Sequence, residues 1–488
     1  MGIKMILQRI QNGFNNFIFN IQNSNERRKQ MLVIGLAILF CIAAAASGLI
    51  FSSSFTPIFV GLGLCALLLV AVGLRRPWYV LYAAIFLIFI PDGLLPSNIQ
   101  SYLNRGMTVF VFAVWAFDLF VSKKKVYLPL PSVFMVAFLA WAIISMTWAQ
   151  DFSESLTILQ SYILRFLLFL FLTVNLIDTR KKLNGLMNTL ASIGFLLALT
   201  GIAEVFVSGY TPGTRFKVLG MNENAVGILL LISLLGVLWW ASQPSAKFST
   251  LKKLIGVLYI IFAILLIVMT GSRGSAISMI ATLCLLLFWK STRLWGLVAL
   301  VIVLLGIVAA PSLFFTIIDR FSSAGYSGDT TLGGREALWQ AAWLMIQDHP
   351  LQGVGIGNAY LQMRNYFSDS SIQTYLMPLQ VWNSESVPPH NPVLTIWADV
   401  GAIGLTLYLG ILVTAIYSFL RSYWRNRHTS LQMYYGLMIA VFIGYFLSWI
   451  KGGGMESDHS FFMMIAFFVI PSILEKNHEV DDTDKAIG

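Results

Sequence analysis

Apolar runs of about twenty residues recur along this chain from Met31 to Leu474, and few charges interrupt them. A helix needs about 20 apolar residues to cross a hydrocarbon core of about 30 Å. Only 11% of the 488 residues are charged, against about a quarter in an ordinary soluble domain. The alternating strands of about ten residues that an outer-membrane barrel requires are absent from the pattern. The sequence therefore predicts an all-α polytopic membrane protein.

The apolar runs divide the chain into five parts. We predict about fourteen transmembrane helices, of which about eleven lie in residues 31–311 and about three in residues 393–474. The predicted spans lie near residues 31–50, 55–74, 78–95, 107–121, 129–149, 157–177, 186–207, 224–241, 254–271, 275–290, 294–311, 393–420, 433–450 and 460–474. Residues 312–392 form the one long loop. Residues 1–30 have apolar positions at helical spacing and are predicted to lie on the inner leaflet as an interfacial helix, the alternative being a disordered leader. Residues 475–488 form an acidic tail that is predicted to be solvated.

Basic residues set the orientation, because Lys and Arg are retained on the cytoplasmic side of short loops. With the N-terminus inside, every second loop is basic, in keeping with a formal net charge of +10. The basic loops contain Arg75 and Arg76, Lys123 to Lys125, Arg180 to Lys182, Lys247 to Lys253, Lys290 to Arg293, and Arg421 to Arg427. Both termini are therefore predicted to be cytoplasmic, and the loop 312–392 to be extracytoplasmic.

The long loop contains two segments with the pattern of short amphipathic helices. Residues 335–347 follow two glycines and place Leu338, Ala342 and Ile346 on one face. A flexible glycine-rich turn at residues 353–357 separates them from an aromatic-rich stretch at 360–366. The GxGxG spacing of the turn is not expected to bind nucleotides, because no parallel strand precedes it.

Three arginines on the predicted outer side are candidates for anion binding: Arg215 in TPGTRFK, Arg273 in TGSRGS and Arg335 in GGREAL. Arg273 and Arg335 are each next to a glycine, so the planar guanidinium meets little neighbouring bulk. Its five donors suit a diphosphate or a carboxylate. The alternative is that each arginine binds lipid head groups or extends to the membrane interface.

His390 lies between Pro389 and Asn391 in the motif PPHNP, where the long loop re-enters the membrane. Proline restrains the backbone on both sides and leaves the imidazole as the reactive group. Histidine can accept a proton near neutral pH, as activation of a sugar hydroxyl requires. The alternative is an ordinary surface histidine.

Other ionisable residues lie in or near the predicted spans. Arg165 is in the middle of a span, and we favour a structural ion pair with Glu204 or Asp399 over donor binding. Glu223 is predicted either to cap a helix or to bind an acceptor sugar. Asp458, in an acidic patch with Glu456 and His459, is a second candidate for acceptor binding. The three cysteines, Cys41, Cys65 and Cys284, all fall in predicted spans, so neither a disulfide framework nor a metal site is expected.

Several of these segments together resemble the O-antigen ligase and O-antigen polymerase superfamily. They are the GSRG motif at 271–274, the loop segments at 333–343 and 349–358, and the stretch at 389–404. In ligases of this family a histidine is separated by ten residues from a glycine, and His390 with Gly401 fits that spacing. Arg335 takes the place of a family arginine followed by a leucine, although Leu338 comes one position sooner. Arg215 resembles another essential arginine of the family.

The resemblance implies a metal-independent GT-C glycosyltransferase of the bacterial cytoplasmic membrane that uses no cofactor and no nucleic acid. Its donor would be an oligosaccharide on polyprenyl (undecaprenyl) diphosphate, and its acceptor a glycan or glycolipid hydroxyl. His390 and Arg273 would be catalytic, and Arg215, Arg273 and Arg335 would hold the diphosphate. We favour polymerisation of a cell-surface or cell-wall polysaccharide. The alternatives are ligation of the glycan to a lipid core or another terminal acceptor, and a flippase for lipid-linked sugars.

Overall fold

The structure of the protein is a computed structural model, and it describes eight stretches of the chain. These are residues 72–89, 97–122, 125–210, 215–244, 248–315, 335–366, 389–450 and 459–477. Regular secondary structure within these stretches is helical throughout. The predicted interfacial helix at 1–30, the predicted span at 31–50, most of the next one and nearly all of the C-terminal tail lie outside the described residues.

Nine helical segments in the described stretches are long and apolar enough to cross a membrane. They comprise α5 (Ser97–Ser122), α6 (Leu130–Ser145) with η2 (Met146–Trp148), α7 (Phe152–Arg165) with η3 (Phe166–Leu172) and α8 (Thr173–Leu176), α9 (Arg180–Ser208), α10 (Glu223–Ser242), α11 (Ser249–Thr270), α18 (Pro392–Asn426), α19 (Gln432–Trp449) and α20 (His459–Lys476). Shorter apolar helices are α4 (Pro77–Ile88), α12 (Arg273–Leu285) and α13 (Arg293–Ala309). Every predicted span from residue 78 onwards coincides with one of these helices. The all-helical class is therefore confirmed for the described residues, while the total of about fourteen spans stays a prediction.

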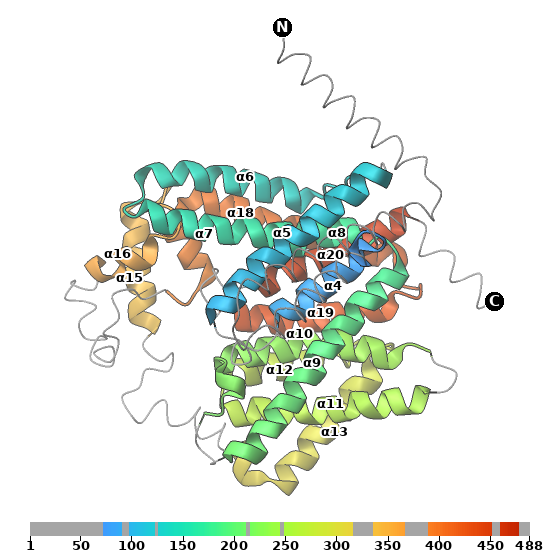
Figure 1. The fold of residues 1–488 in the computed structure, drawn as a ribbon. Helices are drawn as coiled ribbons and strands as arrows, with labels where there is room; N and C mark the ends of the chain where they lie inside the picture. The colour runs from blue at the N-terminus through green and yellow to red at the C-terminus, as the bar shows by residue number, and fades with distance from the viewer. Residues whose placement is uncertain are drawn as a thin grey trace, which may run out of the picture. The chain divides into compact units, whose positions relative to one another are not determined.

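The chain forms two compact units. One contains residues 1–84 and 105–127, and the other contains residues 85–104 and 128–488. Every described candidate residue for function belongs to the second unit. In that unit α10 packs against α9, α11 and α19, and α12 packs against α19 and α10, as the green, yellow and red helices of Figure 1 show. In the same unit α18 packs against α6 and α20.

Small residues let these helices approach closely. A Cβ added to Gly444 of α19 would lie 1.9 Å from Thr282 Oγ1 of α12, and one added to Gly236 of α10 would lie 2.5 Å from the carbonyl oxygen of Met187 of α9. Such contacts exclude any side chain at these two positions. Close backbone approach at glycine is a usual basis of helix packing in membrane proteins.

The long loop contains helices at both predicted positions, α15 (Arg335–Asp348) and α16 (Ala359–Tyr366). They pack against each other and against α18. The Tyr366 hydroxyl donates a hydrogen bond to Asp348 Oδ2 at 3.0 Å. Burial and then the neighbouring Asp348 raise the pKa of Tyr366 to about 12, so the phenol stays protonated as the donor at neutral pH. The side of the membrane on which this pair of helices lies stays a prediction.

Candidate functional site

A tight turn joins α11 to α12 and places Arg273 at the start of the second helix. Gly271 ends α11 in the left-handed conformation, with φ of 60°, which costs glycine no steric strain. Ser272 then caps α12, because its hydroxyl oxygen accepts a hydrogen bond from the backbone N–H of Ser275 at 3.2 Å. Arg273 is therefore the first residue of α12 and is only partly buried. The GSRG motif is a helix end followed by a capped helix start.

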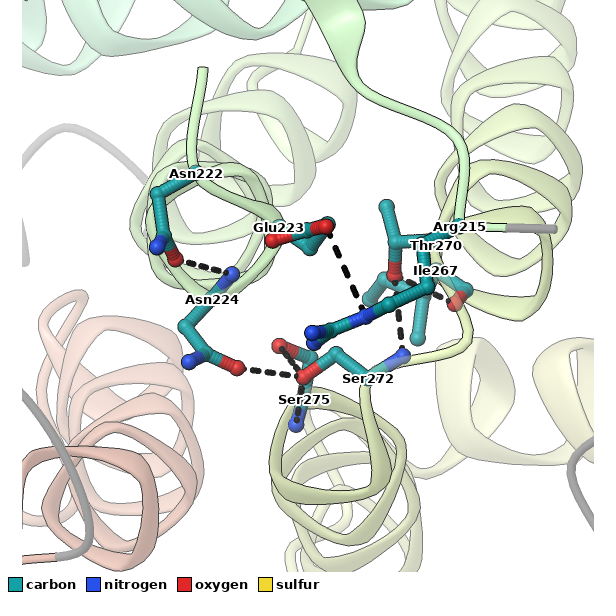
Figure 2. Close-up of polar contacts among 8 residues, drawn as sticks. All are labelled: Arg215, Asn222, Glu223, Asn224, Ile267, Thr270, Ser272 and Ser275. Atoms are coloured by element: carbon teal, nitrogen blue, oxygen red, sulfur yellow. Dashed lines mark hydrogen bonds and ion pairs between the residues drawn. The ribbon is translucent and has the colours of Figure 1, made fainter. Parts of the chain in front are cut away.

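The start of α10 lies beside this turn. Asn222 caps α10 by accepting a hydrogen bond from the backbone N–H of Asn224 at 2.9 Å. Glu223 is the first residue of the helix, where a negative charge is favourable. The Ser272 hydroxyl donates to Asn224 Oδ1 at 2.7 Å, which joins the N-termini of α10 and α12 (Figure 2). The two helix starts therefore converge on one place.

Arg215 reaches the same place from the segment that precedes α10. Its Nε lies 3.4 Å from Glu223 Oε1, and its side chain is 45% exposed whereas that of Glu223 is 8% exposed. The backbone N–H of Phe216 donates to the carbonyl oxygen of Met269 near the end of α11 at 3.1 Å. In Figure 2 the Arg215 side chain extends between Glu223 and Ser272. The structure thus gathers Arg215, Glu223 and the turn that carries Arg273.

The electrostatics of this assembly favour an anion. A helix N-terminus carries about half a positive charge and presents unpaired backbone N–H groups, which is why phosphates bind there. Arg215 and Arg273 add two positive charges, and Glu223 removes one. The Arg215 side chain is 45% exposed and Arg273 is partly exposed, so both residues reach the surface of the described structure. We call this assembly of Arg215, Glu223, Asn224, Ser272 and Arg273 the helix-end cluster.

His390 lies at the start of α18, in a second group of contacts. Its backbone is left-handed, with φ of 51°, a conformation that few residues other than glycine adopt. Asn391 caps α18 by accepting hydrogen bonds from the backbone N–H groups of Val393 and Leu394 at 3.0 and 3.2 Å. Pro392 occupies the first helical position, where proline is favourable. In the PPHNP motif a histidine with an unfavourable backbone conformation therefore precedes a helix start that both Asn391 and Pro392 favour.

The start of α15 is fastened to this histidine segment. The indole N–H of Trp339 donates to the carbonyl oxygen of Pro389, the residue before His390, at 3.0 Å. Trp339 lies one helical turn after Arg335. The structure thus brings the helix that begins at Arg335 to the backbone beside His390. The side chain of Arg335 itself, like Glu456 and Asp458, lies outside what the structure describes.

The helix that follows His390 is broken at Gly401, where φ is 69° and ψ is −174°. The turn at residues 350–355 fills the break. The backbone N–H groups of Val354 and Gly355 donate to the carbonyl oxygens of Ala398 and Asp399 at 2.9 and 2.8 Å. The N–H of Ala402 donates to the carbonyl oxygen of Pro350 at 2.9 Å. The glycine-rich turn, expected to be flexible, is therefore hydrogen-bonded into α18.

The two acidic residues that were predicted as partners of Arg165 each accept a backbone hydrogen bond. Glu204 accepts from the N–H of Leu219, and Asp399 Oδ1 accepts from the N–H of Ala359 at 2.7 Å, which caps α16. Each carboxylate therefore has a backbone N–H as a hydrogen-bond partner. The ion pair with Arg165 stays a prediction.

Three residues of these assemblies were not among the predicted site residues. Asn224, Ser272 and Trp339 hold the segments that carry Arg273 and His390. Of these three, Ser272 carries a sequence signal, since serine is a typical helix-capping residue. The contacts between separate segments have no signal in the sequence, because no spacing rule relates Asn224 to Ser272 or Trp339 to Pro389.

Comparison with known proteins gives matches over most of the chain. Residues 258–409 match a family described as O-antigen ligase, and residues 58–229 match a family of unknown function. A protein named O-antigen ligase from Salmonella typhimurium is 23% identical over 340 residues, which are 66% of this chain and 78% of that protein. The first match contains the GSRG turn, the α15 and α16 loop, His390 and Gly401. These matches confirm the resemblance of this chain to the O-antigen ligase and polymerase superfamily.

Proposed function

We propose that this protein transfers an oligosaccharide from a polyprenyl diphosphate to a hydroxyl acceptor at the outer face of the bacterial cytoplasmic membrane. The observation that carries the proposal is the helix-end cluster, in which two helix N-termini meet Arg215 and the turn that carries Arg273. A diphosphate is the leaving group of such a donor. Its developing negative charge is stabilised by donors that are already oriented before the reaction.

Each candidate residue has a place in this reaction. Arg273 and Arg215 hold the diphosphate, and Arg335 approaches it from the loop. His390 takes the proton of the acceptor hydroxyl as that oxygen forms a bond to the anomeric carbon. The bond from the anomeric carbon to the diphosphate oxygen breaks, and polyprenyl diphosphate leaves. The reaction needs neither a nucleotide sugar nor a metal ion, and Glu223 or Asp458 binds the acceptor.

The acceptor decides whether the product is a polymer or a ligated glycan. The sequence led us to favour polymerisation, in which a second lipid-linked repeat is the acceptor. The family and the Salmonella protein that match this chain both carry the name of a ligase, which supports transfer to a lipid core or another terminal acceptor. Neither match is to a transporter, so the flippase alternative gains no support.

Purified protein in detergent with a lipid-linked oligosaccharide tests the proposal. A transferase releases free polyprenyl diphosphate and extends the acceptor, whereas a flippase does neither. A ladder of products indicates polymerisation, and a single transfer to an added acceptor indicates ligation. Arg273→Lys keeps the charge but loses the two-pronged geometry, so it should lose most activity. Arg425→Lys, in an exposed ion pair with Glu475, is the matched control and should retain activity.

A further inference from the structure

The Asn224 side chain is the direct link between the helix start that pairs with Arg215 and the helix start that carries Arg273. Its Oδ1 accepts the hydrogen bond of the Ser272 hydroxyl at 2.7 Å. Figure 2 shows this bond spanning from α10 to the turn before α12. The two helices are also close at the next turn, since a Cβ on Gly227 would lie 2.1 Å from Ser275 Oγ.

The bond fixes the Ser272 hydroxyl completely. A serine hydroxyl has one donor and two acceptor positions. Ser272 donates to Asn224, and it accepts from the backbone N–H of Ser275 at 3.2 Å and from the hydroxyl of Ser275 at 2.9 Å. The residue is only 2% exposed, so water does not replace these partners. Removal of Asn224 would leave a buried hydroxyl without an acceptor and would free the turn to reorient.

Arg273 directly follows Ser272. The orientation of this turn therefore sets the direction in which the Arg273 side chain projects from α12. A shift of about 1 Å in a group that contacts the reacting atoms can cost on the order of 10²-fold in rate. Asn222 offers a contrast. It is exposed and bonds within the start of its own helix, at the backbone N–H of Asn224.

We propose that Asn224 is a positioning residue, which acts through Ser272 to orient Arg273 toward the diphosphate of the donor. This inference rests on the proposed function, because it takes Arg273 as a diphosphate-binding residue. It adds a second requirement: the orientation of Arg273 depends on the hydrogen bond between Ser272 and Asn224 of the neighbouring helix α10, and not on α12 alone.

The test measures the affinity of the full chain in detergent for polyprenyl diphosphate without sugar, together with turnover of the lipid-linked donor. We expect Asn224→Ala to weaken binding about threefold to tenfold, the range set by one lost hydrogen bond. Asn222→Ala removes a helix cap at the same helix start without breaking the bond to Ser272, and it should weaken binding by less than about twofold. Asn224→Ser, whose hydroxyl is too short to replace the amide oxygen, provides a second variant with a polar side chain.

A double variant separates positioning from general destabilisation. In the Arg273→Lys protein the guanidinium fork is already lost, so adding Asn224→Ala should have little further effect on affinity. Additive losses, or wild-type affinity of both the Asn224→Ala and Asn224→Ser proteins, would overturn the positioning role while leaving the proposed function intact. Near wild-type turnover by Arg273→Lys would overturn the role of Arg273 in diphosphate binding, and the positioning role with it, whereas a wild-type protein that does not turn over the lipid-linked donor would overturn the proposed function.

Discussion

At Gly401 a side chain would meet both an unfavourable backbone conformation and neighbouring backbone atoms. The predicted perturbation is Gly401→Ala, which adds one methyl group. The backbone there has φ of 69° and ψ of −174°, a region that is accessible essentially to glycine alone. An added Cβ would lie 2.0 Å from the carbonyl oxygen of Leu351 and 2.5 Å from the backbone nitrogen of Gln352. Backbone atoms cannot rotate away as a side chain can.

The cost follows from two contributions. A residue forced into such a backbone region costs about 1 to 3 kcal/mol. Overpacking in a rigid site costs about 1 to 3 kcal/mol more. The total is about 2 to 6 kcal/mol. It destabilises the state in which the turn at 350–355 is hydrogen-bonded to α18. A loss of about 3 kcal/mol raises the open fraction of that turn by more than about a hundredfold.

Hydrogen exchange at the amides of Val354 and Gly355 measures this opening, since both donate across the break in α18. Gly274→Ala is the matched control, because a Cβ at Gly274 meets nothing within 4 Å. It lies in the first turn of α12, where alanine is a better helix former by about 1 kcal/mol. Exchange at wild-type rates in Gly401→Ala would refute the reasoning, as would equal effects of the two substitutions.

Three further predictions concern the orientation and the chemistry. Cysteines placed at positions 330, 370 and 455 should react with an impermeant thiol reagent in whole cells, whereas cysteines at 124 and 424 should not; labelling at 124 would reverse the orientation. His390→Ala should lose about 3 to 5 kcal/mol of transition-state stabilisation with little change in diphosphate affinity. A pH-independent rate together with an active His390→Lys would instead make His390 a phosphate-binding cation. Glu223→Gln removes the charge that offsets Arg215, so polyprenyl diphosphate should bind about twofold to fivefold more tightly; a raised KM for the acceptor alone would assign Glu223 to acceptor binding.

The helices were predictable because a span is a local property of the sequence. About twenty apolar residues must satisfy their backbone within one segment, and the helix does so without reference to the rest of the chain. The same holds for the helix starts at Asn222, Ser272 and Asn391, each of which is a capping residue within a few positions of an apolar helix. Local rules therefore gave the segments on which Arg273 and His390 lie.

The contacts that hold these segments depend on packing and were not predictable. Asn224 and Ser272 meet because Gly227 lets α10 approach Ser275 closely. Arg215 and Glu223 are predicted to bind separate ligands, the donor and the acceptor, and both roles stay predictions; the structure shows that their side chains also lie 3.4 Å apart. An ion pair between a loop and a helix start requires the path of the chain in space, which residue spacing does not contain.

The spacing from His390 to Gly401 corresponds in the structure to the length of one helical segment. Both residues have a positive φ, and they lie at the two ends of one short helical segment that begins at Pro392. One residue more or less in that segment would rotate one end against the other by about 100°, since an α-helix has about 3.6 residues per turn. The break at Gly401 would then no longer face the turn at 350–355, or the backbone beside His390 would turn away from Trp339 of α15. The segment is therefore a spacer of fixed length, which sets the position of the histidine relative to the loop helices that pack against it.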